Sequence, residues 1–478
     1  MSVSSRTTVT LGPSGRRFFV ETWGCQMNEL DSQRMAGQLM AQGLLPTHAV
    51  EEADVILLNS CSVREKAVNK VYSRLGEYRL LKQARPELRI GLCGCVAQQE
   101  GERALERVRE LDFVLGPARV GELGELLSRV ARGERPVVTG FPEARDYDID
   151  AISRDGAYKG MVTAIEGCDK RCTFCIVPTT RGPERCRPLA RIVEEARQLL
   201  DYGFVEIELL GQTVNHWREP RGGAADFADL LDAVAGLAGL ERLRFVTSYP
   251  RDFTPRMVER FARHSKLADY FHIPVQSGSD PVLRRMGRGY TIEDYLVLVE
   301  QARAARRSIA LSTDLIVGFP GESEDDFRRT LDLVEGVRFA ALFAFCYSPR
   351  PGTAATRLGP EVPREVAEER LQRLLSLQSS IQAELHRELV GRQFEVLVTA
   401  QGKQTGRWVG RTSCHRIVHL DGAGELVRLG RMTTVRIDRA MPHSLGGVAV
   451  GGRARHSGHE VTGSPEPGRR SAVLPVLG

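Results

Sequence analysis

The sequence predicts an α/β protein with three regions: an N-terminal doubly wound parallel α/β domain, a central partial (β/α)6 barrel and a small C-terminal antiparallel β-barrel. Three observations predict this architecture. Short apolar runs alternate with helical stretches up to residue 133. Six further apolar runs, each followed by a helical stretch, lie within residues 160–391. Between residues 392 and 449, apolar residues recur at every second position and glycines separate the runs.

The N-terminal domain is expected over residues 16–133. Its elements are predicted as strands at residues 18–20, 54–59, 89–92 and 113–115 and as helices at residues 30–42 and 66–84. Because parallel strands end at one edge of their sheet, a ligand should bind beside the carboxyl ends of these strands. Residues 134–159 are polar, contain Pro136 and Pro142, and are predicted to form a linker.

The central region is expected over residues 160–391. Its six strands are predicted at residues 161–167, 206–210, 243–248, 271–276, 312–318 and 342–347. Six strand–helix units are fewer than a complete (β/α)8 barrel has, so we expect an open barrel with its site at the carboxyl ends of the strands. A long helix, residues 365–389, precedes the C-terminal barrel of residues 392–449. Residues 450–478 are rich in Gly, Arg, Ser and Pro and are predicted to be a disordered tail.

The composition limits the class of protein. The chain has 478 residues and a formal net charge of +5, which permits a nucleic-acid partner without requiring one. Residues 1–15 lack the apolar core of a secretory signal, and the chain has no run of about 18 apolar residues, so we expect a cytoplasmic protein without a membrane partner. In that reducing compartment, the 10 cysteines are expected to serve metal or redox sites rather than disulfides.

Three cysteines with the spacing CxxxCxxC carry the strongest chemical signal. Cys168, Cys172 and Cys175 follow the apolar run of residues 161–165. Three thiolates at this spacing can bind three irons of a cubane iron–sulfur cluster. The fourth iron then lacks a protein ligand, and the amino group and carboxylate of S-adenosylmethionine are its usual occupants. A cluster that reduces a bound sulfonium compound generates radicals, so the motif predicts an enzyme.

A zinc site is the alternative interpretation of these cysteines, because closely spaced cysteines are often zinc ligands. Zinc would need a fourth ligand, for which Cys186 is a candidate. Cys186 lies beyond Pro178 and Pro183, however, and no second CxxC pair surrounds it. The flanking Phe174 and Arg171 also favour a cluster loop. The zinc interpretation would make the chain a zinc-stabilised RNA-binding protein without enzymatic activity.

A second set of cysteines, Cys25, Cys61 and Cys95, follows three successive predicted strands at intervals of about 35 residues. If these strands are neighbours, their ends would bring three thiols to one edge of the sheet, as a second cluster requires. Cys93 competes with Cys95, but Cys93 still lies within the strand run. The alternative is that buried cysteines lie near strand ends by chance.

With these motifs in order, residues 18–448 resemble the radical methylthiotransferases, and within them the tRNA type that modifies isopentenylated adenosine. The resemblance is carried by residues 22–30, 59–67, 94–99, 167–185, 209–215, 272–280, 313–322 and 344–353. The central region resembles the radical SAM core of that family, and the third region resembles its TRAM domain, a small RNA-binding β-barrel.

The resemblance implies two 4Fe–4S clusters. Cys168, Cys172 and Cys175 would bind the cluster that cleaves S-adenosylmethionine, and Cys25, Cys61 and Cys95 would bind an auxiliary cluster where sulfur is handled. The implied reaction replaces the C–H bond at carbon-2 of N6-isopentenyladenosine, next to the anticodon, with a methylthio group, using two S-adenosylmethionine per turnover. No acid–base residue can deprotonate such a position usefully, so cofactors must carry the chemistry. The implied partners are the anticodon stem-loop of tRNA and an electron-donor protein, and we expect a monomer.

The resemblance assigns further residues to cofactor binding, all of them at predicted strand ends: Gly211, Gln212, Gln276, Ser277 and Asp314. Glycine and serine are also ordinary turn residues, which is the structural alternative. Arg181 and Arg185, beyond the CxxxCxxC loop, are candidates for a substrate phosphate or a cofactor carboxylate, with solvated arginine as the equal alternative.

In the third region, a basic set around one tryptophan is the candidate RNA surface: Lys403, Arg407, Trp408, Arg411 and Arg416. Individually these arginines could be merely solvated, and Trp408 could belong to the core. Sibling enzymes of the same architecture modify threonylcarbamoyl-adenosine in tRNA or an aspartate of a ribosomal protein. The basic third region favours RNA, and the Arg64-Glu65-Lys66 and Arg181–Glu184 segments favour the isopentenyl type by likeness.

Overall fold

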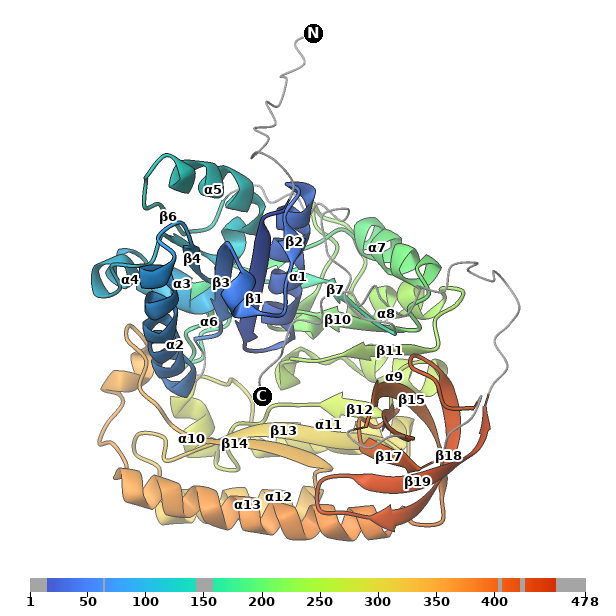
Figure 1. Cartoon of the computed structure of the whole chain (residues 1–478). Helices are drawn as coiled ribbons and strands as arrows, with labels where there is room; N and C mark the ends of the chain where they lie inside the picture. Colours follow the sequence, from blue (N-terminus) through green and yellow to red (C-terminus); the bar gives the residue numbers. More distant parts are fainter. Residues whose placement is uncertain (1–14, 63–64, 143–157, 403–405, 422–425, 453–478) are drawn as a thin grey trace. The chain divides into compact units, whose positions relative to one another are not determined.

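The computed structural model describes residues 15–62, 65–142, 158–402, 406–421 and 426–452, except the side chains of residues 65–67. The chain divides into two compact units (Figure 1). The first unit contains the chain up to residue 156, together with residues 176–183 from later in the sequence. The second unit contains residues 157–175 and the chain from residue 184 to 463. No helix among the described residues is long and apolar enough to cross a membrane.

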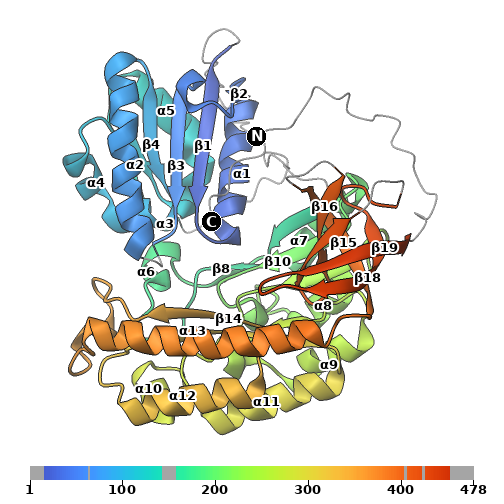
Figure 2. The ribbon, with the colours of Figure 1, turned by 60° about the horizontal axis from the view of Figure 1, so that its bottom comes forward.

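A six-stranded parallel sheet forms the centre of the first unit, in the order β2-β1-β3-β4-β5-β6. Its strands are β1 (Arg17–Trp23), β2 (Leu45–Pro46), β3 (Val55–Ser60), β4 (Arg89–Cys93), β5 (Phe113–Leu115) and β6 (Val137–Val138). Figure 2 shows β1, β3 and β4 side by side. The predicted cysteine-bearing strands are therefore neighbours in one sheet.

Helices cover both faces of this sheet. They are α1 (Gln26–Ala41), α2 (Glu65–Ala84), α3 (Gly94–Glu100), α4 (Glu102–Arg107) and α5 (Leu123–Ala131). Successive strand residues point to opposite faces, so Phe18 joins a core that includes Leu39 of α1 and Leu126 of α5. The adjacent Phe19 joins the other core, with Leu75 of α2. These two cores confirm the predicted doubly wound fold.

Two boundaries in the first unit differ from the predicted ones. Helix α1 begins at Gln26 rather than at residue 30, because the amides of Asn28 and Glu29 already donate to the Cys25 carbonyl. Strand β6 lies inside the predicted linker, since Val138 accepts a hydrogen bond from Gly116 and extends the sheet beyond residue 133. Residues 143–157 of that linker lie outside the described part of the chain.

The second unit contains the six strands predicted for the partial barrel. They are β7 (Lys159–Thr163), β10 (Glu206–Leu210), β11 (Arg242–Phe245), β12 (Tyr270–His272), β13 (Ala310–Val317) and β14 (Ala341–Cys346). They form two three-stranded parallel sheets, β11-β10-β7 and β12-β13-β14. A bridge from Leu243 to Leu267 and a hydrogen bond from Ser248 to the His272 carbonyl join the two sheets. A short ribbon of β8 (Ile165–Glu166) and β9 (Arg185–Cys186) follows β7.

Helices follow the strands and enclose one large apolar core. They are α7 (Leu189–Asp201), α8 (Phe227–Ala235), α9 (Pro255–Arg263), α10 (Asp280–Arg285), α11 (Ile292–Ala305), α12 (Glu324–Val337) and α13 (Arg364–Arg387). A capping box of Ser323 and Asp326 starts α12, which buries Phe327 and Val334 in the core. The long helix α13 lies beside α12 (Figure 2) and agrees with the helix predicted at residues 365–389.

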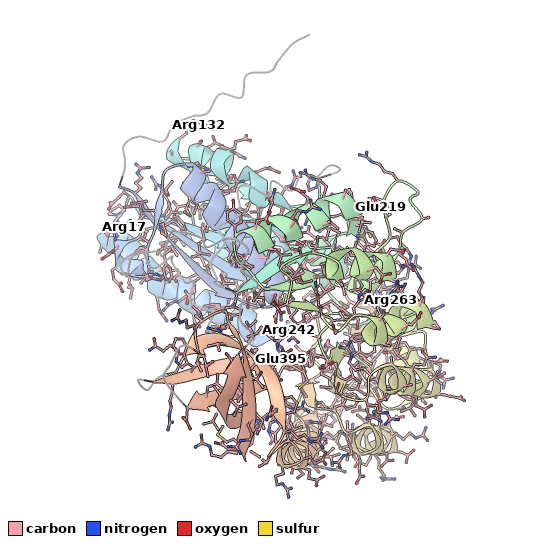
Figure 3. All side chains as sticks on the ribbon, turned by 90° about the vertical axis from the view of Figure 1, so that its right-hand side faces the viewer. Arg17, Arg132, Glu219, Arg242, Arg263 and Glu395 are labelled. Atoms are coloured by element: carbon pink, nitrogen blue, oxygen red, sulfur yellow. The ribbon has the colours of Figure 1, made fainter. Side chains whose placement is uncertain are left out.

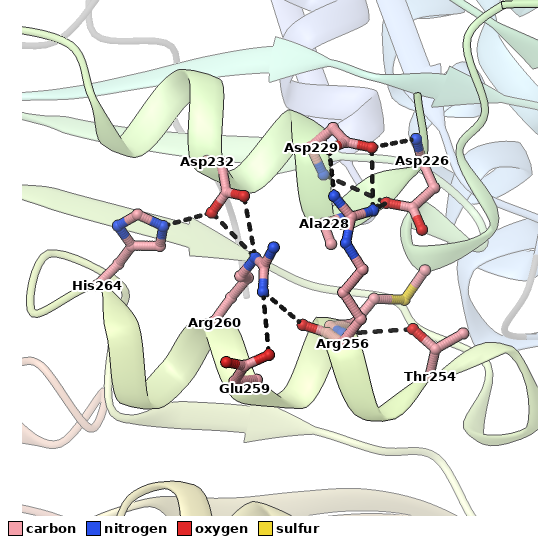
Figure 4. A network of polar contacts seen from close by, with 10 residues as sticks. Asp226, Ala228, Asp229, Asp232, Thr254, Arg256, Glu259, Arg260 and His264 are labelled. Carbon is pink, nitrogen blue, oxygen red and sulfur yellow. Dashed lines mark hydrogen bonds and ion pairs between the residues drawn. The ribbon is translucent and has the colours of Figure 1, made fainter. Parts of the chain in front are cut away.

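Helices α8 and α9 are also joined by ion pairs on their outer side (Figure 4). Arg256 of α9 bridges Asp226 and Asp229, while Arg260 and His264 both contact Asp232. The hydrogen bond from Arg256 lowers the pKa of Asp229 to about 2, against a smaller opposing effect of burial.

A closed five-stranded barrel ends the second unit, in the order β15-β16-β17-β19-β18. Its strands are β15 (Gln393–Gln401), β16 (Arg407–Thr412), β17 (Ile417–Asp421), β18 (Met432–Ala440) and β19 (Leu445–Gly452). The predicted antiparallel barrel is present with one exception: β17 and β19 pair in parallel to close it. Strand β19 takes up the first residues of the predicted tail, and residues 453–478 lie outside the described residues.

The small barrel packs against the edge of the β11-β10-β7 sheet. Arg242 of β11, which is labelled in Figure 3, lies near the small barrel. It donates a hydrogen bond to the Arg411 carbonyl at 3.2 Å. The Asp269 amide donates to the Ser413 hydroxyl at 2.9 Å, and the Tyr270 ring lies 5.0 Å from the His415 ring. The barrel therefore has defined polar contacts with the strands that precede it.

Candidate active site

The structure brings the thiols of the second cysteine set together at one edge of the first unit's sheet. Cys25 caps the start of α1 after β1, Cys61 follows β3, and Cys95 is the second residue of α3 after β4. Cys61 is hydrogen-bonded through its side chain to both Cys25 and Cys95. Cys61 and Cys95 are buried, whereas Cys25 is exposed. One face of this thiol cluster is thus open to solvent.

Two glycines make this close arrangement possible. A Cβ atom at Gly24 would lie 2.4 Å from Oδ1 of Asn28, and one at Gly94 would lie 2.2 Å from Oδ1 of Asn59. Gly94 also has a φ of +84°, a conformation that side chains rarely adopt. Each of the two glycines is the neighbour of a cysteine, so the cysteine-bearing turns depend on these residues.

A buried polar network holds the strand ends beside the thiols. Nδ2 of Asn59 donates to the Asn28 carbonyl at 2.9 Å and to the Ser32 hydroxyl at 2.8 Å. The Ser32 hydroxyl lies 2.6 Å from that of Thr22. The network ties β1 and β3 to α1, so it preorganises two of the three cysteines.

Arg181 from residues 176–183 lies beside the same thiols. Its Nε donates to Sγ of Cys95 at 3.2 Å, and its Nη1 lies 2.7 Å from a carboxylate oxygen of Asp31. This buried position excludes the solvated arginine that the sequence offered as an alternative. Arg181 belongs to the first unit because of contacts with residues distant in the sequence, and no local pattern around Arg181 predicts them.

The three thiols of this set differ in pKa. The hydrogen bond from Cys61 lowers the pKa of Cys95 to about 6 and that of Cys25 to about 7. Desolvation by the surrounding protein opposes both shifts, although Cys25 keeps contact with solvent, and the charge of Arg181 adds to the lowering. The same hydrogen bonds raise the pKa of Cys61. Cys93, by contrast, is wholly buried in the core against α1, where burial raises its pKa. The geometry thus favours Cys95 over Cys93 as the third member of the set.

The CxxxCxxC loop of the second unit is fastened to the end of α10. The Thr173 amide donates to the Met286 carbonyl at 3.0 Å, and its hydroxyl donates to the Arg285 carbonyl at 2.8 Å. A Cβ atom at Gly287, where φ is +70°, would lie 2.8 Å from the Arg171 carbonyl oxygen. Contacts with a distant helix therefore set the path of the loop.

Around this loop, Cys168 is buried and Cys172 and Cys175 are half-buried. Burial raises the pKa of Cys168, and hydrogen bonds partly offset it. Arg288, which is buried, donates to Sγ of Cys172 at 3.4 Å. The sequence offered no signal for Arg288, because it lies far from the cysteines along the chain.

The donor atoms at both sites fit an iron–sulfur cluster. Each site offers three thiols, soft ligands that such clusters require, and each has an arginine donating to one sulfur. Among the described residues, no three or more His, Cys, Asp or Glu side chains are arranged to hold a metal ion. A cubane cluster takes one thiolate per iron, so its ligands need not converge on one point. The zinc candidate Cys186 instead accepts the Arg218 amide at 3.4 Å.

The predicted cofactor-binding residues lie at strand ends of the partial barrel. Gly211 follows β10, and a Cβ atom there would lie 2.3 Å from Ile165. Oε1 of Gln212 is buried and has no hydrogen-bond partner among the described residues. Asp314, in β13, lies 3.5 Å from Nε2 of His272. Gln212 and Asp314 therefore keep polar groups that could hold a ligand.

The two other predicted cofactor-binding residues, Gln276 and Ser277, follow β12 and differ from each other in their role. Gln276 has a φ of +77°, which is strained for a residue with a side chain, and strain of this kind is common at functional sites. Thr247, after β11, shares this feature with a φ of +64°, and the sequence did not single it out. Ser277 is fully buried and its hydroxyl accepts the Ser279 amide at 3.2 Å, as a turn residue does.

The predicted RNA-binding residues of the small barrel are only partly free. Trp408 packs against the barrel core, and Arg407 pairs with Asp421 at 3.2 Å at the surface. Arg411 donates to the His415 carbonyl at 3.4 Å, and Arg416 donates to Sγ of Cys414 at 2.7 Å. Lys403 lies outside the described residues, as does Arg64.

Comparisons with known proteins cover nearly the whole chain. Three family profiles match in order: the uncharacterized protein family UPF0004 at residues 17–116, the radical SAM superfamily at residues 162–334 and the TRAM domain at residues 387–450. The tRNA-2-methylthio-N(6)-dimethylallyladenosine synthase of Cereibacter sphaeroides is 47% identical over 440 residues, which are 91% of this chain and 99% of that protein. The protein of the same name from Anaeromyxobacter dehalogenans is 46% identical, over 91% of this chain and 94% of its own.

Among solved structures, the radical S-adenosylmethionine methyltransferase TsrM from Kitasatospora setae is similar in fold. It gives a TM-score of 0.52 at 15% sequence identity, covering 81% of this chain and 78% of that one. At this identity the likeness supports the radical SAM fold and says nothing about the reaction.

Proposed function

Because the chain belongs to the family of tRNA-2-methylthio-N(6)-dimethylallyladenosine synthases, we propose that it converts N6-isopentenyladenosine next to the anticodon of tRNA into its 2-methylthio derivative. The observation that carries this proposal is the identity of 47% over 99% of the length of a relative with that name. The order of the three matching profiles supports it.

The cysteine geometry supports the assignment of cofactors. Membership of the radical SAM superfamily implies S-adenosylmethionine and a 4Fe–4S cluster. We assign that cluster to Cys168, Cys172 and Cys175, and a second, auxiliary 4Fe–4S cluster to Cys25, Cys61 and Cys95. When bound, these groups would supply a radical that removes the hydrogen from carbon-2, and the sulfur and methyl group of the product, with two S-adenosylmethionine consumed per turnover.

The chain's own residues position these groups. Arg288 holds the Cys172 sulfur, and the α10 contacts of Thr173 fix the loop between the ligands. Gly211, Gln212, Gln276, Ser277 and Asp314 are proposed to line the S-adenosylmethionine site at the carboxyl ends of the strands. Of these, Gly211 allows the backbone to pass close to Ile165, and Ser277 stabilises the turn after β12. Gln212 and Asp314 offer polar side chains to the ligand.

The partners follow from the substrate. We propose that the anticodon stem-loop binds the small barrel through Arg407, Arg411, Arg416 and Lys403, with Trp408 acting mainly as a core residue. An electron-donor protein would reduce the clusters, and the enzyme would act as a monomer in the cytoplasm, where tRNA is modified.

Two alanine variants separate the assigned clusters. Cys172→Ala should abolish formation of 5′-deoxyadenosine while tRNA binding is retained. Cys61→Ala should still form 5′-deoxyadenosine but should insert no sulfur. 5′-Deoxyadenosine from the Cys172→Ala enzyme, or methylthiolated product from the Cys61→Ala enzyme, would contradict the corresponding assignment.

The substrate is tested by mass spectrometry of tRNA nucleosides from cells that lack the gene, with and without a plasmid copy. We expect loss of 2-methylthio-isopentenyladenosine, accumulation of isopentenyladenosine and reversal of both by the plasmid. An unchanged profile would direct the substrate assignment to threonylcarbamoyl-adenosine or to the ribosomal-protein aspartate.

A further inference from the structure

We propose that Arg181 is a positioning residue of the auxiliary site, which donates a hydrogen bond to the Cys95 thiolate and supplies the positive charge that sets the reduction potential of the cluster held there. The inference rests on the proposed function, because it takes the auxiliary cluster at Cys25, Cys61 and Cys95 as its premise. It gives a specific role to residues 176–183.

Arg181 reaches the second cysteine set from a segment that directly follows the CxxxCxxC loop. Residues 176–183 directly follow Cys175, the last cysteine of the CxxxCxxC loop, yet they belong to the first unit. They form α6 (Val177–Arg181), whose last residue is Arg181. Gly182 then turns the chain with a φ of +81°, and a Cβ atom there would lie 2.6 Å from the Phe141 ring. The position of Arg181 is therefore closely constrained.

The guanidinium of Arg181 has one nitrogen without a hydrogen-bond partner among the described residues. The side chain is buried, with 5% of its surface exposed, and its Nε donates to Cys95. Nη1 lies 2.7 Å from a carboxylate oxygen of Asp31, whereas Nη2 is buried and has no hydrogen-bond partner among the described residues. Buried donors without a partner are costly, so an anionic group with additional acceptors, such as cluster sulfide, would suit this position.

Charged groups lie close to the thiols. Asp31, which is buried, lies between Arg181 and Arg34, whose Nη1 is 3.5 Å from the carboxylate. A cluster bound by three thiolates would be negative overall, and the buried guanidinium of Arg181, whose Nε lies 3.2 Å from Sγ of Cys95, would stabilise that negative charge.

A purely structural ion pair explains the arrangement less well. A buried pair of Arg and Asp rarely stabilises a fold more than apolar residues of the same size would. The pair alone also leaves unexplained why Nε faces a thiol rather than an oxygen. A hydrogen bond to a ligand sulfur and a nearby positive charge, in contrast, favour the reduced and more negative form of an iron–sulfur cluster.

The experiment uses the full chain with Cys168, Cys172 and Cys175 replaced by alanine, so that only the auxiliary cluster remains. The protein is reconstituted with ferrous iron and sulfide, its iron is counted, and the cluster is titrated by one electron with detection by electron paramagnetic resonance. In this parent protein, Arg181→Gln should shift the equilibrium between the two redox states of the cluster at least tenfold toward the oxidised form. For a one-electron couple this corresponds to a reduction potential that is more negative by about 59 mV. Asp31→Asn should shift the potential in the opposite direction.

Arg129→Gln is the matched control, because it removes the same charge from a surface pair with Glu134 in the same unit. It should leave the potential unchanged. Full iron content with an unchanged potential in Arg181→Gln would overturn the inference, as would shifts of the same sign in Arg181→Gln and Asp31→Asn. If Arg181→Gln binds no iron, Arg181→Lys decides: recovered iron with a potential near that of the parent supports the role of the charge, and no recovery assigns Arg181 to the fold alone.

Failure of the proposed function would look different. If the parent protein with only Cys25, Cys61 and Cys95 binds no iron, the auxiliary cluster is absent and both proposals fall. If the parent binds a cluster whose potential ignores Arg181, only the present inference falls.

Discussion

Single residues at the sheet edge of the first unit decide whether three thiols can meet. Cys25, Cys61 and Cys95 come from three neighbouring strands, and each lies where the chain turns away from the sheet. The turns depend on small neighbours, since Gly24 and Gly94 have no room for a Cβ atom. Function and fold are therefore coupled most tightly at these glycines.

Gly94→Ala should destabilise the first unit by about 1–3 kcal/mol, because it combines an unfavourable φ with a clash against Asn59. The measurement is urea unfolding of the iron-free protein, followed by circular dichroism. The control is Gly121→Ala in the same unit, where a Cβ atom would meet nothing within 4 Å. Equal stability of the two variants would contradict the proposed constraint.

Elements of the second unit are tied together by ion pairs of very different burial. Glu322, which follows β13, pairs with Arg370 of α13 at 2.8 Å, and both side chains are buried. Its carboxylate also accepts the Gly318 amide at 2.6 Å, so Glu322 links the segment after β13 to α13. The pairs that join α8 to α9 are instead at the surface (Figure 4).

Glu322→Gln should lower the free energy of unfolding by about 3 kcal/mol, because it removes the buried charge partner of Arg370 and leaves only the half-exposed Glu324, 3.4 Å from its Nε. Urea unfolding measures the loss. Glu368→Gln removes an exposed pair with Arg364 of the same helix and should cost about 0.5 kcal/mol or less. A loss in Glu322→Gln no larger than in Glu368→Gln would show that the buried pair does not anchor α13.

The surface pair of Asp229 and Arg256 should depend on pH. Because the pKa of Asp229 is lowered to about 2 in the folded protein, the unfolded chain takes up the proton first as the pH falls. The stabilisation should be complete above about pH 4 and disappear between pH 4 and pH 2. A double-mutant cycle of Asp229→Asn and Arg256→Gln measures it as a small coupling free energy. A coupling that is unchanged at pH 2 would refute the assignment.

At the scale of the whole molecule, the chain combines a doubly wound domain, a radical SAM core and a TRAM barrel, in the order that the family profiles match. The net charge of +5 is modest, so binding of an RNA should rely on local basic groups rather than on the overall field. Arg407 is the most exposed of the described candidates on the barrel, with 53% of its side chain accessible.

Arg407→Ala should weaken tRNA binding, because it removes a phosphate contact, and should reduce the slope of log affinity against log salt by about 1. Filter binding at several salt concentrations measures both. Arg132→Ala removes an equally charged and exposed arginine from the first unit (Figure 3) and should leave the slope unchanged. The same slope for both variants would remove Arg407 from the RNA surface.

Much of the fold follows from local patterns. The six strands of the partial barrel, the long helix before the small barrel and the doubly wound domain were all predictable from periodicity. Helix α1 begins earlier than predicted, because the Cys25 carbonyl already accepts hydrogen bonds before the apolar pattern starts. The parallel pair of β17 and β19 could not be anticipated, since closure of a barrel depends on strands that are distant in the chain.

The sequence by itself determined the two cysteine sets, their positions after strands and the family to which the chain belongs. These features depend only on the spacing of residues along the chain and on the residues that form turns. Only the tertiary structure decided which groups surround the thiols. Arg181 reaches Cys95 and Asp31 from residues 176–183, and Arg288 reaches Cys172 from the end of α10. The physical reason is that buried charged groups pair with residues that are close in space but distant in the sequence. The periodicity of a sequence, in contrast, indicates only local secondary structure.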